Sequence, residues 1–366
     1  MRILQLVTGE KWTGTAAVVF DQTAALVEAG IEAQFGFIGE SPLARRLAPL
    51  GWARPILRRP RGPLRFVQDV ETLRAMLGRE KFEVVHAHAT HDHYLAAFAV
   101  GQTGVRLVRT LHHTRHVRKG PLSRALRRRT TAFGFANRAI ASQFGARGPI
   151  HSPAVDPRRF TPEGNPSELA SRLGASGAAF LVGTVGKLAA GRGHQEAIRA
   201  LGGLPTGAAL LHVGKGDEER ALESLAASLG LGDRNFWTGY QEEELPALYR
   251  SMQVFLFTAS GSEQGQRAIL EAMASGVPVV ALDLPGVRDL VTEGEQGFVA
   301  RDMDGLVSGL RRLMEDPELR IRLGRRARMR AQDFTPQKFA AAAKSFYEGV
   351  LSPEGLPELS ARAPGS

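Results

Sequence analysis

The chain has 366 residues, of which 43% are hydrophobic and 23% charged. This composition is typical of soluble globular proteins, and the length favours two domains. Cysteine is absent, which excludes disulfides, thiolate nucleophiles and cysteine-ligated metals. No apolar run approaches the roughly 18 residues that span a bilayer, and the first residues lack the apolar core and cleavage site of a signal peptide. These features predict a cytoplasmic protein.

The charge is unevenly distributed along the chain. The formal net charge is +10, but residues 1–150 carry 23 Lys and Arg against 10 Asp and Glu, whereas the remainder carries 24 against 27. Such asymmetry predicts an anionic partner for the first half: nucleic acid, a membrane surface or a phosphorylated substrate. A solvated basic surface is the alternative.

In the first half, short apolar strands alternate with helices. Strands are predicted at 2–8, 82–88, 105–112 and 138–142, and helices at 15–30, ending at Gly30, and at 122–136, which is strongly basic. This alternation implies a parallel sheet with helices on both faces.

Residues 152–168 hold four prolines and are predicted to link two domains. After them the alternation restarts. Strands are predicted at 179–186, 208–214, 235–240, 254–259 and 277–282, and helices at 194–201, 218–230, 244–252, 267–276, 304–314, 317–332 and 336–351. The sequence therefore predicts an α/β protein with two Rossmann-like, doubly wound domains that bind ligands between them, at the carboxyl ends of both sheets.

The strongest chemical signal is the segment GSEQGQRAILEAMASGVPVVALDLPGVRDLV. Glu263 lies in a glycine-rich loop after a predicted strand, and Glu271 lies about two turns into the next helix. Gly265, Gln266 and Arg267 can present backbone N–H groups at the N-terminus of that helix, which suits a diphosphate. Glu271 adjoins a buried strand and needs a partner, and a glutamate so placed can accept hydrogen bonds from ribose hydroxyls. The alternative is a pair of glutamates on a solvated helix.

Two cations follow an earlier predicted strand of the same half. Lys187 and Arg192 lie in the loop after residues 179–186, and Gly191 and Gly193 flank the arginine. Two fixed cations and a helix N-terminus can stabilise a departing nucleoside diphosphate without a metal. Taken alone, these residues would be ordinary loop cations.

These motifs resemble the donor site of glycosyltransferase family 4, which comprises retaining enzymes with the GT-B fold. The family carries two glutamates separated by seven residues, here Glu263 and Glu271, followed by AMASGVPVVA, PGVRDLV and EGEQGFV. Upstream, VGTVGKLAAGRGHQEAIRAL and LLHVGKGDEE are similar to the family's basic loop and glycine turn. The resemblance covers most of residues 180–300. The first half matches more loosely, through Gly14, VVHAH and RTLHH.

The resemblance implies a domain plan and a reaction. Residues 1–165 would form the acceptor-binding domain, and residues 166–335 would form the domain that binds the nucleotide sugar. Residues 336–350 would form a helix that returns to the first domain, and residues 351–366 would form a flexible tail. The enzyme would transfer a sugar from a nucleotide-diphosphate donor, which is expected to be a UDP-sugar. The acceptor would be a hydroxyl of a glycolipid or cell-envelope polysaccharide, as in lipopolysaccharide biosynthesis. The anomeric configuration would be retained through front-face displacement.

The resemblance also implies roles for individual residues. Glu263 would hold sugar hydroxyls, Glu271 the ribose, and Lys187 and Arg192 the diphosphate. His112 in RTLHH would lie close to the reacting sugar, and the adjacent His113 is the alternative for that role. Gly14 would allow the backbone to approach the diphosphate or the acceptor. The family usually has two adjacent glycines at this turn, whereas this chain reads Trp12-Thr13-Gly14-Thr15.

No metal or other cofactor is expected. His86 and His88 share one face of a strand and, with His91 and His93, could suggest a metal site, but the family is metal-independent and zinc sites usually bring firmer spacing. Strand packing and hydrogen bonding are the preferred interpretation. Asp302-Met303-Asp304 resembles a metal-binding triplet, but it precedes a predicted helix, where aspartate serves as a cap.

The run from Arg106 to Arg129 holds nine cations and no acid. It predicts a basic, partly apolar surface for anionic lipid headgroups or a phosphorylated acceptor, and peripheral binding to the inner face of the cell membrane. The residues assigned to acceptor or membrane are Arg115, Arg118, Lys119, Arg124, Arg127, Arg128 and Arg129.

Two alternative functions remain for the whole protein. One is a GT-B sugar-nucleotide epimerase. The other is a nucleic-acid-binding protein, which the low aromatic content of 7% disfavours.

Overall fold

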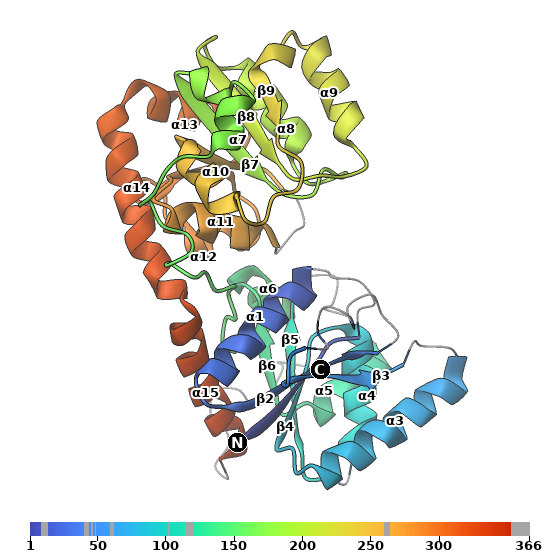
Figure 1. Ribbon diagram of the computed structural model, residues 1–366. Helices are drawn as coiled ribbons and strands as arrows, with labels where there is room; N and C mark the ends of the chain where they lie inside the picture. Colours follow the sequence, from blue (N-terminus) through green and yellow to red (C-terminus); the bar gives the residue numbers. More distant parts are fainter. Residues whose placement is uncertain are drawn as a thin grey trace. The chain divides into compact units, whose positions relative to one another are not determined.

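A computed structural model describes residues 1–8, 14–39, 44, 47, 49–58, 62–101, 103–113, 120–259 and 264–352. The chain divides into two compact units (Figure 1). Unit 1 comprises Met1–Ala154 together with the segment that begins at Pro336, and unit 2 comprises Val155–Thr335. The division therefore falls inside the proline-rich stretch, whereas the sequence predicted a boundary near residue 165.

Unit 1 is built on a six-stranded parallel sheet with the strand order β3-β2-β1-β4-β5-β6. Its strands are β1 (Arg2–Leu6), β2 (Glu32–Ile38), β3 (Ala53–Leu57), β4 (Val84–Ala87), β5 (Arg106–Leu111) and β6 (Ala132–Phe135). Its helices are α1 (Gly14–Glu28), α3 (Gly62–Arg79), α4 (Thr90–Ala99), α5 (Pro121–Arg129), α6 (Arg138–Phe144) and α15 (Pro336–Leu351). This strand order is the doubly wound Rossmann arrangement.

Helices cover both faces of this sheet. On one face, Leu73 of α3 and Leu95 of α4 are buried in one apolar cluster with Leu4 of β1. On the other face, Leu26 of α1 and Tyr347 of α15 belong to a second cluster. Because both faces are covered, the central strands are nearly continuous apolar runs, which is why they were recognisable in the sequence. The last helix of the chain thus belongs to the core of unit 1.

Unit 2 repeats the plan, with the order β12-β11-β10-β7-β8-β9. Its strands are β7 (Phe180–Val185), β8 (Ala208–Val213), β9 (Asn235–Trp237), β10 (Val254–Phe257), β11 (Val279–Leu282) and β12 (Gly297–Ala300). Its helices are α7 (Glu168–Arg172), α8 (His194–Gly202), α9 (Glu219–Ser228), α10 (Leu245–Ser251), α11 (Gln264–Ala274), α12 (Val287–Leu290), α13 (Met303–Glu315) and α14 (Pro317–Ala331). The predicted pair of Rossmann-like domains is confirmed.

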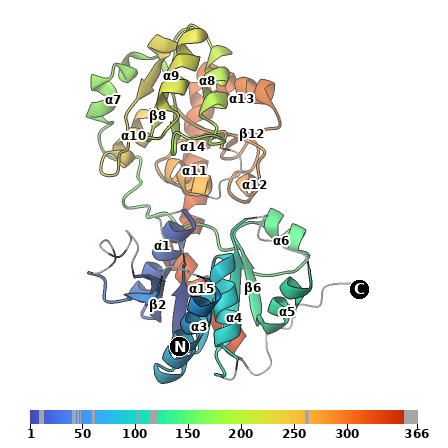
Figure 2. The same cartoon turned by 90° about the vertical axis from the view of Figure 1, so that its right-hand side faces the viewer.

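The sheet of unit 2 is also sandwiched between helices, as Figures 1 and 2 show. Leu248 of α10, Ile269 of α11 and Ala327 of α14 are buried in one cluster. Ile198 of α8 and Leu306 of α13 are buried in the other. Among the described residues, no helix is both long enough and apolar enough to cross a membrane.

Two predictions for residues 122–142 are wrong. The helix predicted at 122–136 ends at Arg129, and residues 132–135 form β6. The backbone at Thr130 is extended, and the β-branched pair Thr130-Thr131 with the buried Phe133 and Phe135 favours a strand. The strand predicted at 138–142 is α6, which Asn137 caps by accepting a hydrogen bond from Ile140 N–H and which ends at the left-handed Gly145.

Candidate active site

The strand order of unit 2 places its ligand-binding edge between β7 and β10. The chain moves from β7 outwards to β9, then returns to the other side of β7 to form β10. Ligands of doubly wound sheets bind at this switch point, outside the carboxyl ends of the strands. The loop after β7 contains Lys187 and Arg192, and the helix after β10 is α11. Thus two segments that were predicted to bind the donor leave neighbouring strands at the same edge.

The loop after β7 is fastened to the end of β10. Thr258 Oγ1 donates a hydrogen bond to the carbonyl oxygen of Gly193 at 2.6 Å. Gly193 has φ +81°, and a Cβ at this position would overlap the backbone of Thr258. Only glycine fits both the conformation and the close approach. The glycine that follows Arg192 therefore fixes the cationic loop against the next strand.

The glycine turn after β8 supports the same loop from the other side. Leu188 N–H donates to the carbonyl oxygen of Lys215 at 3.2 Å. A Cβ on Gly214 would overlap the carbonyl of Gly186, and a Cβ on Gly216 would overlap that of Leu188. The GKGD turn of residues 214–217 is thus a structural brace for the Lys187 loop.

The two cations differ in their surroundings. Lys187 is exposed, and its Nζ lies 3.7 Å from Oδ2 of the exposed Asp217, a pairing that contributes little to stability in water. Arg192 is half-buried. Burial, together with the smaller effect of the Arg192 charge, lowers the pKa of the neighbouring His194 to about 4. His194 is therefore neutral near pH 7.

A buried polar chain beneath this loop was not anticipated from the sequence. His212 Nε2 lies 2.9 Å from Asn235 Oδ1, and the Asn235 amide donates to the Leu231 carbonyl oxygen at 2.8 Å. His212 Nε2 therefore carries the proton, and His212 Nδ1 accepts from His194 Nδ1 at 3.2 Å. The Trp237 ring stacks on His212 with ring centroids 3.9 Å apart. These contacts hold the start of α8.

Glu271 has the partners that its buried position requires. It is 5% exposed; Arg267 Nε donates to its Oε1 at 2.9 Å and Tyr249 OH to its Oε2 at 3.0 Å. Burial raises the pKa of Glu271, whereas Arg267 and Tyr249 oppose that rise. The expectation that this carboxylate needs a partner is confirmed. Tyr249, which comes from α10, was missed because it is 22 residues away in sequence.

The remaining predicted donor residues lie at the beginning of α11. Gly265 is in its first turn. Gln266 is 2% exposed, and its side-chain nitrogen has no hydrogen-bond partner in the described structure. Glu263 lies outside the described residues. Its role therefore stays a prediction.

In unit 1, the histidines form a buried hydrogen-bond network at the corresponding switch point, between β1 and β4. His88 Nδ1 lies 3.0 Å from His112 Nε2, and His88 Nε2 lies 2.7 Å from Gln5 Oε1. Gln5 Nε2 donates to Tyr347 OH at 2.9 Å, and Tyr347 OH lies 2.7 Å from His86 Nδ1. His112 is thus connected to the last helix of the chain.

The amide of Gln5 sets the direction of these bonds. Its oxygen faces His88, so His88 Nε2 carries the proton and His88 Nδ1 accepts from His112 Nε2–H. Its nitrogen faces Tyr347, whose hydroxyl therefore donates to His86 Nδ1. Burial and neighbouring positive charges lower the pKa values of His86 and His88 well below the usual range. The His86 and His88 rings are therefore neutral, and the proton that His112 directs to His88 is on Nε2.

This network accounts for His86 and His88 of the predicted cluster by hydrogen bonding, His93 Nε2 lies 2.7 Å from Thr130 Oγ1, and His91 packs edge-on against the Phe66 ring. Both ring nitrogens of His86 and His88 are engaged, since His86 Nε2 lies 2.8 Å from Thr110 Oγ1. Within the part of the chain that the structure describes, no three His, Asp or Glu side chains are arranged to hold a metal ion. Asp302 caps α13, as predicted, by accepting a hydrogen bond from Gly305 N–H at 2.9 Å. Gly14, the other predicted residue of this half, is buried at the start of α1.

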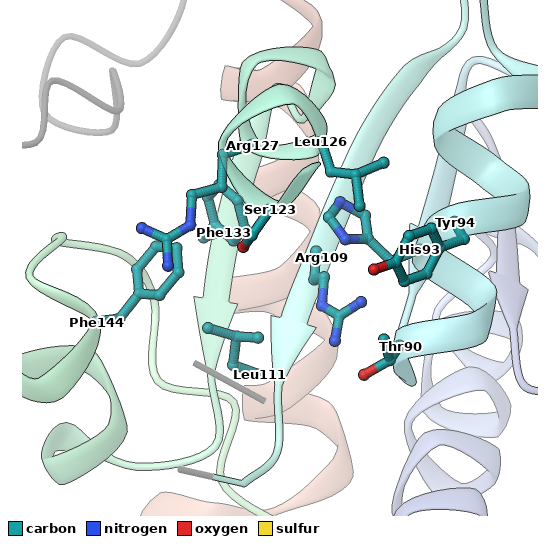
Figure 3. A pocket seen from close by; sticks show the side chains of 10 residues that line it. All are labelled: Thr90, His93, Tyr94, Arg109, Leu111, Ser123, Leu126, Arg127, Phe133 and Phe144. Atoms are coloured by element: carbon teal, nitrogen blue, oxygen red, sulfur yellow. The ribbon is translucent and has the colours of Figure 1, made fainter. Parts of the chain in front are cut away.

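A small pocket opens at the carboxyl end of β5 in unit 1 (Figure 3). Side chains of α4, α5, α6, β5 and β6 converge on it, and its free volume is about 40 Å³. The lining residues are Thr90, His93, Tyr94, Arg109, Leu111, Ser123, Leu126, Arg127, Phe133 and Phe144. Leu111 directly precedes His112, so the pocket adjoins the histidine network. Its central cation, Arg109, was not singled out from the sequence.

The basic residues predicted to contact an acceptor or membrane are only partly described. Arg124, Arg128 and Arg129 are exposed on α5, and Arg129 lies over the ring of Phe98 at 5.4 Å. Arg127 is half-buried and lies over the Phe144 ring at 4.2 Å. Arg115, Arg118 and Lys119 lie outside the described residues.

Comparisons with known proteins agree with this geometry. Residues 12–143 match the model of Glycosyltransferase Family 4, and residues 168–330 match that of Glycosyl transferases group 1. A D-inositol 3-phosphate glycosyltransferase from Frankia alni is 30% identical over 330 residues, which is 80% of each chain. The chain belongs to the family 4, group 1 glycosyltransferases.

Other glycosyltransferases share parts of the sequence or the whole fold. A lipopolysaccharide core biosynthesis glycosyltransferase from Rhizobium meliloti is 30% identical over 158 residues, 43% of this chain and 46% of that one. The solved structure of Anabaena Alr3699/HepE in complex with UDP has a TM-score of 0.80 and 19% identity, covering 95% of this chain and 100% of that one. The GT-B fold expected for this glycosyltransferase is confirmed.

Proposed function

We propose that this glycosyltransferase moves a sugar, with retention and without a metal, from a UDP-sugar to a hydroxyl of a glycolipid or cell-envelope polysaccharide. The observation that carries the proposal is the hydrogen bond between Thr258 and Gly193, which holds the Lys187–Gly193 loop against the end of β10. This contact lies at the switch point of the sheet, and α11 follows β10 there. A diphosphate bound there meets two cations and the N-terminus of a helix.

The charges suit a departing nucleoside diphosphate. Negative charge grows on the diphosphate as the glycosidic bond breaks, and Lys187 and Arg192 stabilise it. Glu263 holds sugar hydroxyls. The acceptor hydroxyl attacks from the face that the diphosphate leaves, and the departing phosphate takes its proton.

The partners of Glu271 prepare it for the ribose. Each carboxylate oxygen carries two lone pairs, and the structure uses one on each oxygen, for Arg267 and Tyr249. The ribose hydroxyls donate to the remaining positions. Because Arg267 and Tyr249 fix the carboxylate, it does not have to reorganise when the nucleotide binds.

His112 lies close to the reacting sugar. Its Nε2 proton is directed to His88, which fixes the orientation of the ring. Similar proteins support these reactants. One was solved with UDP, one is named for a phosphorylated polyol, and one for the lipopolysaccharide core.

Peripheral membrane contact through α5 belongs to the same proposal, at the inner face of the cell membrane. Each exposed arginine near an anionic surface contributes about 1 kcal/mol, so several hold the protein there reversibly. Sedimentation with anionic and neutral liposomes at low and high salt tests this contact. We expect the quadruple serine variant of Arg124, Arg127, Arg128 and Arg129 to lose anionic-liposome binding and keep UDP binding. Equal sedimentation of both proteins would assign these arginines to a solvated face.

The reaction itself is tested by incubating the protein with UDP-sugars, with and without a glycolipid acceptor. NMR of the product should show the anomeric configuration of the donor. Transfer with the inverted configuration would overturn the retaining proposal. Epimerisation of the UDP-sugar in the absence of acceptor would identify a sugar-nucleotide epimerase instead.

A further inference from the structure

We infer that residues 156–167, here called the strap, hold the carboxylate of Glu271 in position for the ribose, and that Phe160 and Arg328 are the positioning residues of this carboxylate. The inference rests on the proposed function, in which Glu271 binds the ribose. The sequence predicted these residues only as a link between two domains. In the structure the strap belongs to unit 2, which begins at Val155.

The aromatic ring of Phe160 connects the strap to a direct partner of Glu271. Phe160 is 3% exposed, and its ring meets the ring of Tyr249 edge-on, with centroids 5.9 Å apart. The ring of Phe255, in β10, lies 5.8 Å from the same tyrosine ring. The Tyr249 hydroxyl in turn donates to Oε2 of Glu271 at 3.0 Å. A displacement of Phe160 would therefore shift one of the hydrogen bonds that orient the carboxylate.

Arg328 of α14 fastens the strap to the helix that carries Glu271. Its Nη1 donates to the carbonyl oxygens of Phe160 at 2.8 Å and Ala274 at 2.6 Å, and its Nη2 donates to that of Pro157 at 3.1 Å. Ala274 is the last residue of α11, where carbonyl oxygens lack partners within the helix and favour a cation. One guanidinium therefore joins the strap to the C-terminal end of α11.

Close packing of α14 against the end of α11 brings Arg328 to these carbonyl oxygens. Gly324 lies four residues before Arg328 and therefore on the same face of the helix. A Cβ on Gly324 would overlap the carbonyl oxygen of Gly276, which follows α11. The strap reaches the same point, since a Cβ on Gly276 would lie 3.3 Å from the Cβ of Pro162. Thus α11, α14 and the strap meet where Arg328 donates its hydrogen bonds.

The rest of the strap is fixed to α10, the helix that carries Tyr249. Arg250 Nε donates to the carbonyl oxygen of Asn165 at 2.9 Å. Ser167 N–H donates to Ser251 Oγ, also at 2.9 Å. Arg250 and Ser251 directly follow Tyr249 in the chain. The strap is therefore bound to both helices that supply the Glu271 carboxylate and its tyrosine partner.

The strap also contributes charge near Glu271. Burial raises the pKa of Glu271, and this rise is opposed by the charge and hydrogen bond of Arg267, by the hydrogen bond from Tyr249, and by the charge of Arg159 in the strap. Arg159 therefore favours the ionised carboxylate, which accepts hydrogen bonds and donates none. This is the form that ribose hydroxyls require.

Calorimetric titration with UDP and with 2′,3′-dideoxy-UDP tests the inference, because the two nucleotides differ only in the ribose hydroxyls. The wild type should bind UDP about tenfold more tightly, the gain expected for a hydrogen bond to a charged group. Phe160→Leu and Arg328→Gln should each reduce this ratio to about threefold or less, and Arg328→Lys should restore part of it. Affinity for the dideoxy nucleotide should change by less than about twofold, because its diphosphate binds elsewhere. Thermal unfolding would verify that each variant is folded.

Arg320→Gln is the matched control. Arg320 is a half-buried arginine of the same helix, and its Nη1 donates to the carbonyl oxygen of Leu313 in α13 at 2.8 Å. This variant should keep the wild-type ratio of the two affinities. If Phe160→Leu and Arg328→Gln discriminate between the nucleotides as well as the wild type does, the strap does not position Glu271 and the inference is overturned.

A wild type that binds both nucleotides equally, or neither of them, would contradict the ribose role of Glu271 and so the proposed function. ¹⁹F NMR of fluorotyrosine-labelled protein then decides whether the strap positions the tyrosine partner of Glu271. The chain has four tyrosines, and Tyr249→Phe identifies the relevant signal. We expect that signal to shift in Arg328→Gln and to stay in place in Arg320→Gln. An unchanged Tyr249 signal in Arg328→Gln would overturn the inference.

Discussion

Removing the hydroxyl of Tyr347 should disturb the site through the histidine network. The hydroxyl accepts from Gln5 Nε2 at 2.9 Å and lies 2.7 Å from His86 Nδ1. Tyr347→Phe keeps the ring in the core but leaves two buried polar groups without this partner. Each such group costs about 1–3 kcal/mol, so we expect a loss of about 2–6 kcal/mol in the free energy of unfolding of unit 1.

The same change should alter catalysis more than donor binding. Without the Tyr347 hydroxyl, the orientation of the Gln5 amide is no longer fixed. The direction of the hydrogen bond between His112 and His88 is then no longer determined. We expect kcat to fall while the affinity for UDP stays within twofold, because the donor site lies in unit 2. ¹⁵N NMR of the histidine rings should detect Nε2–H on His112 in the wild type and a change of tautomer in the variant.

Tyr240→Phe is the control, because it removes a hydroxyl that is hydrogen-bonded to Glu242 at the exposed surface of unit 2. It should change stability by less than about 0.5 kcal/mol. If Tyr347→Phe is no more destabilising than Tyr240→Phe, and the His112 tautomer does not change, the network does not position His112.

Three further predictions concern the donor site, the metal and pH. Lys187→Ala and Arg192→Ala should each lower kcat by about 10²–10³, as when one donor to a developing charge is removed; activity within twofold of wild type in both would contradict the diphosphate assignment. Transfer should survive EDTA, and loss of activity with rescue by manganese would show a metal requirement. Burial lowers the pKa values of His151 and His194 to about 4, so the unfolded chain, with values near 6.5, binds more protons. The contribution of these histidines to the free energy of unfolding should be fully present above pH 6.5 and should decrease as the pH falls towards 4. The decrease is at most about 1.4 kcal/mol per pH unit for each histidine. Denaturant titrations in which the free energy of unfolding stays constant or rises as the pH falls would refute this.

The sequence predicted most of unit 2 because its buried parallel strands are continuous apolar runs between helices. The same reasoning failed at residues 122–136, because the helix was extended beyond its arginine-rich part into β6. Only a few residues indicate this strand in the sequence: the pair Thr130-Thr131 and two phenylalanines that are buried in the structure. At α6, the cap residue Asn137 and the terminal Gly145 were available in the sequence as helix boundaries. Among the longer elements, β2, β3, α3, α4 and β12 were not predicted.

The site was only partly visible in the sequence because its contacts are non-local. The need of Glu271 for a partner follows from its apolar neighbours, and Arg267 is one helical turn away. Tyr249 could not be chosen, since only the fold brings α10 beside α11. Likewise, Tyr347 reaches Gln5 across 342 positions, so the histidine motif alone could not reveal what orients His112.

The most direct test of the donor assignment is hydrogen–deuterium exchange with and without UDP. The account predicts slower exchange in peptides covering residues 186–193 and the first turn of α11, because the diphosphate binds their backbone N–H groups. It predicts little change in the arginine-rich helix α5. UDP that binds yet protects only peptides of unit 1, and none at the carboxyl ends of β7 and β10, would contradict the central claim.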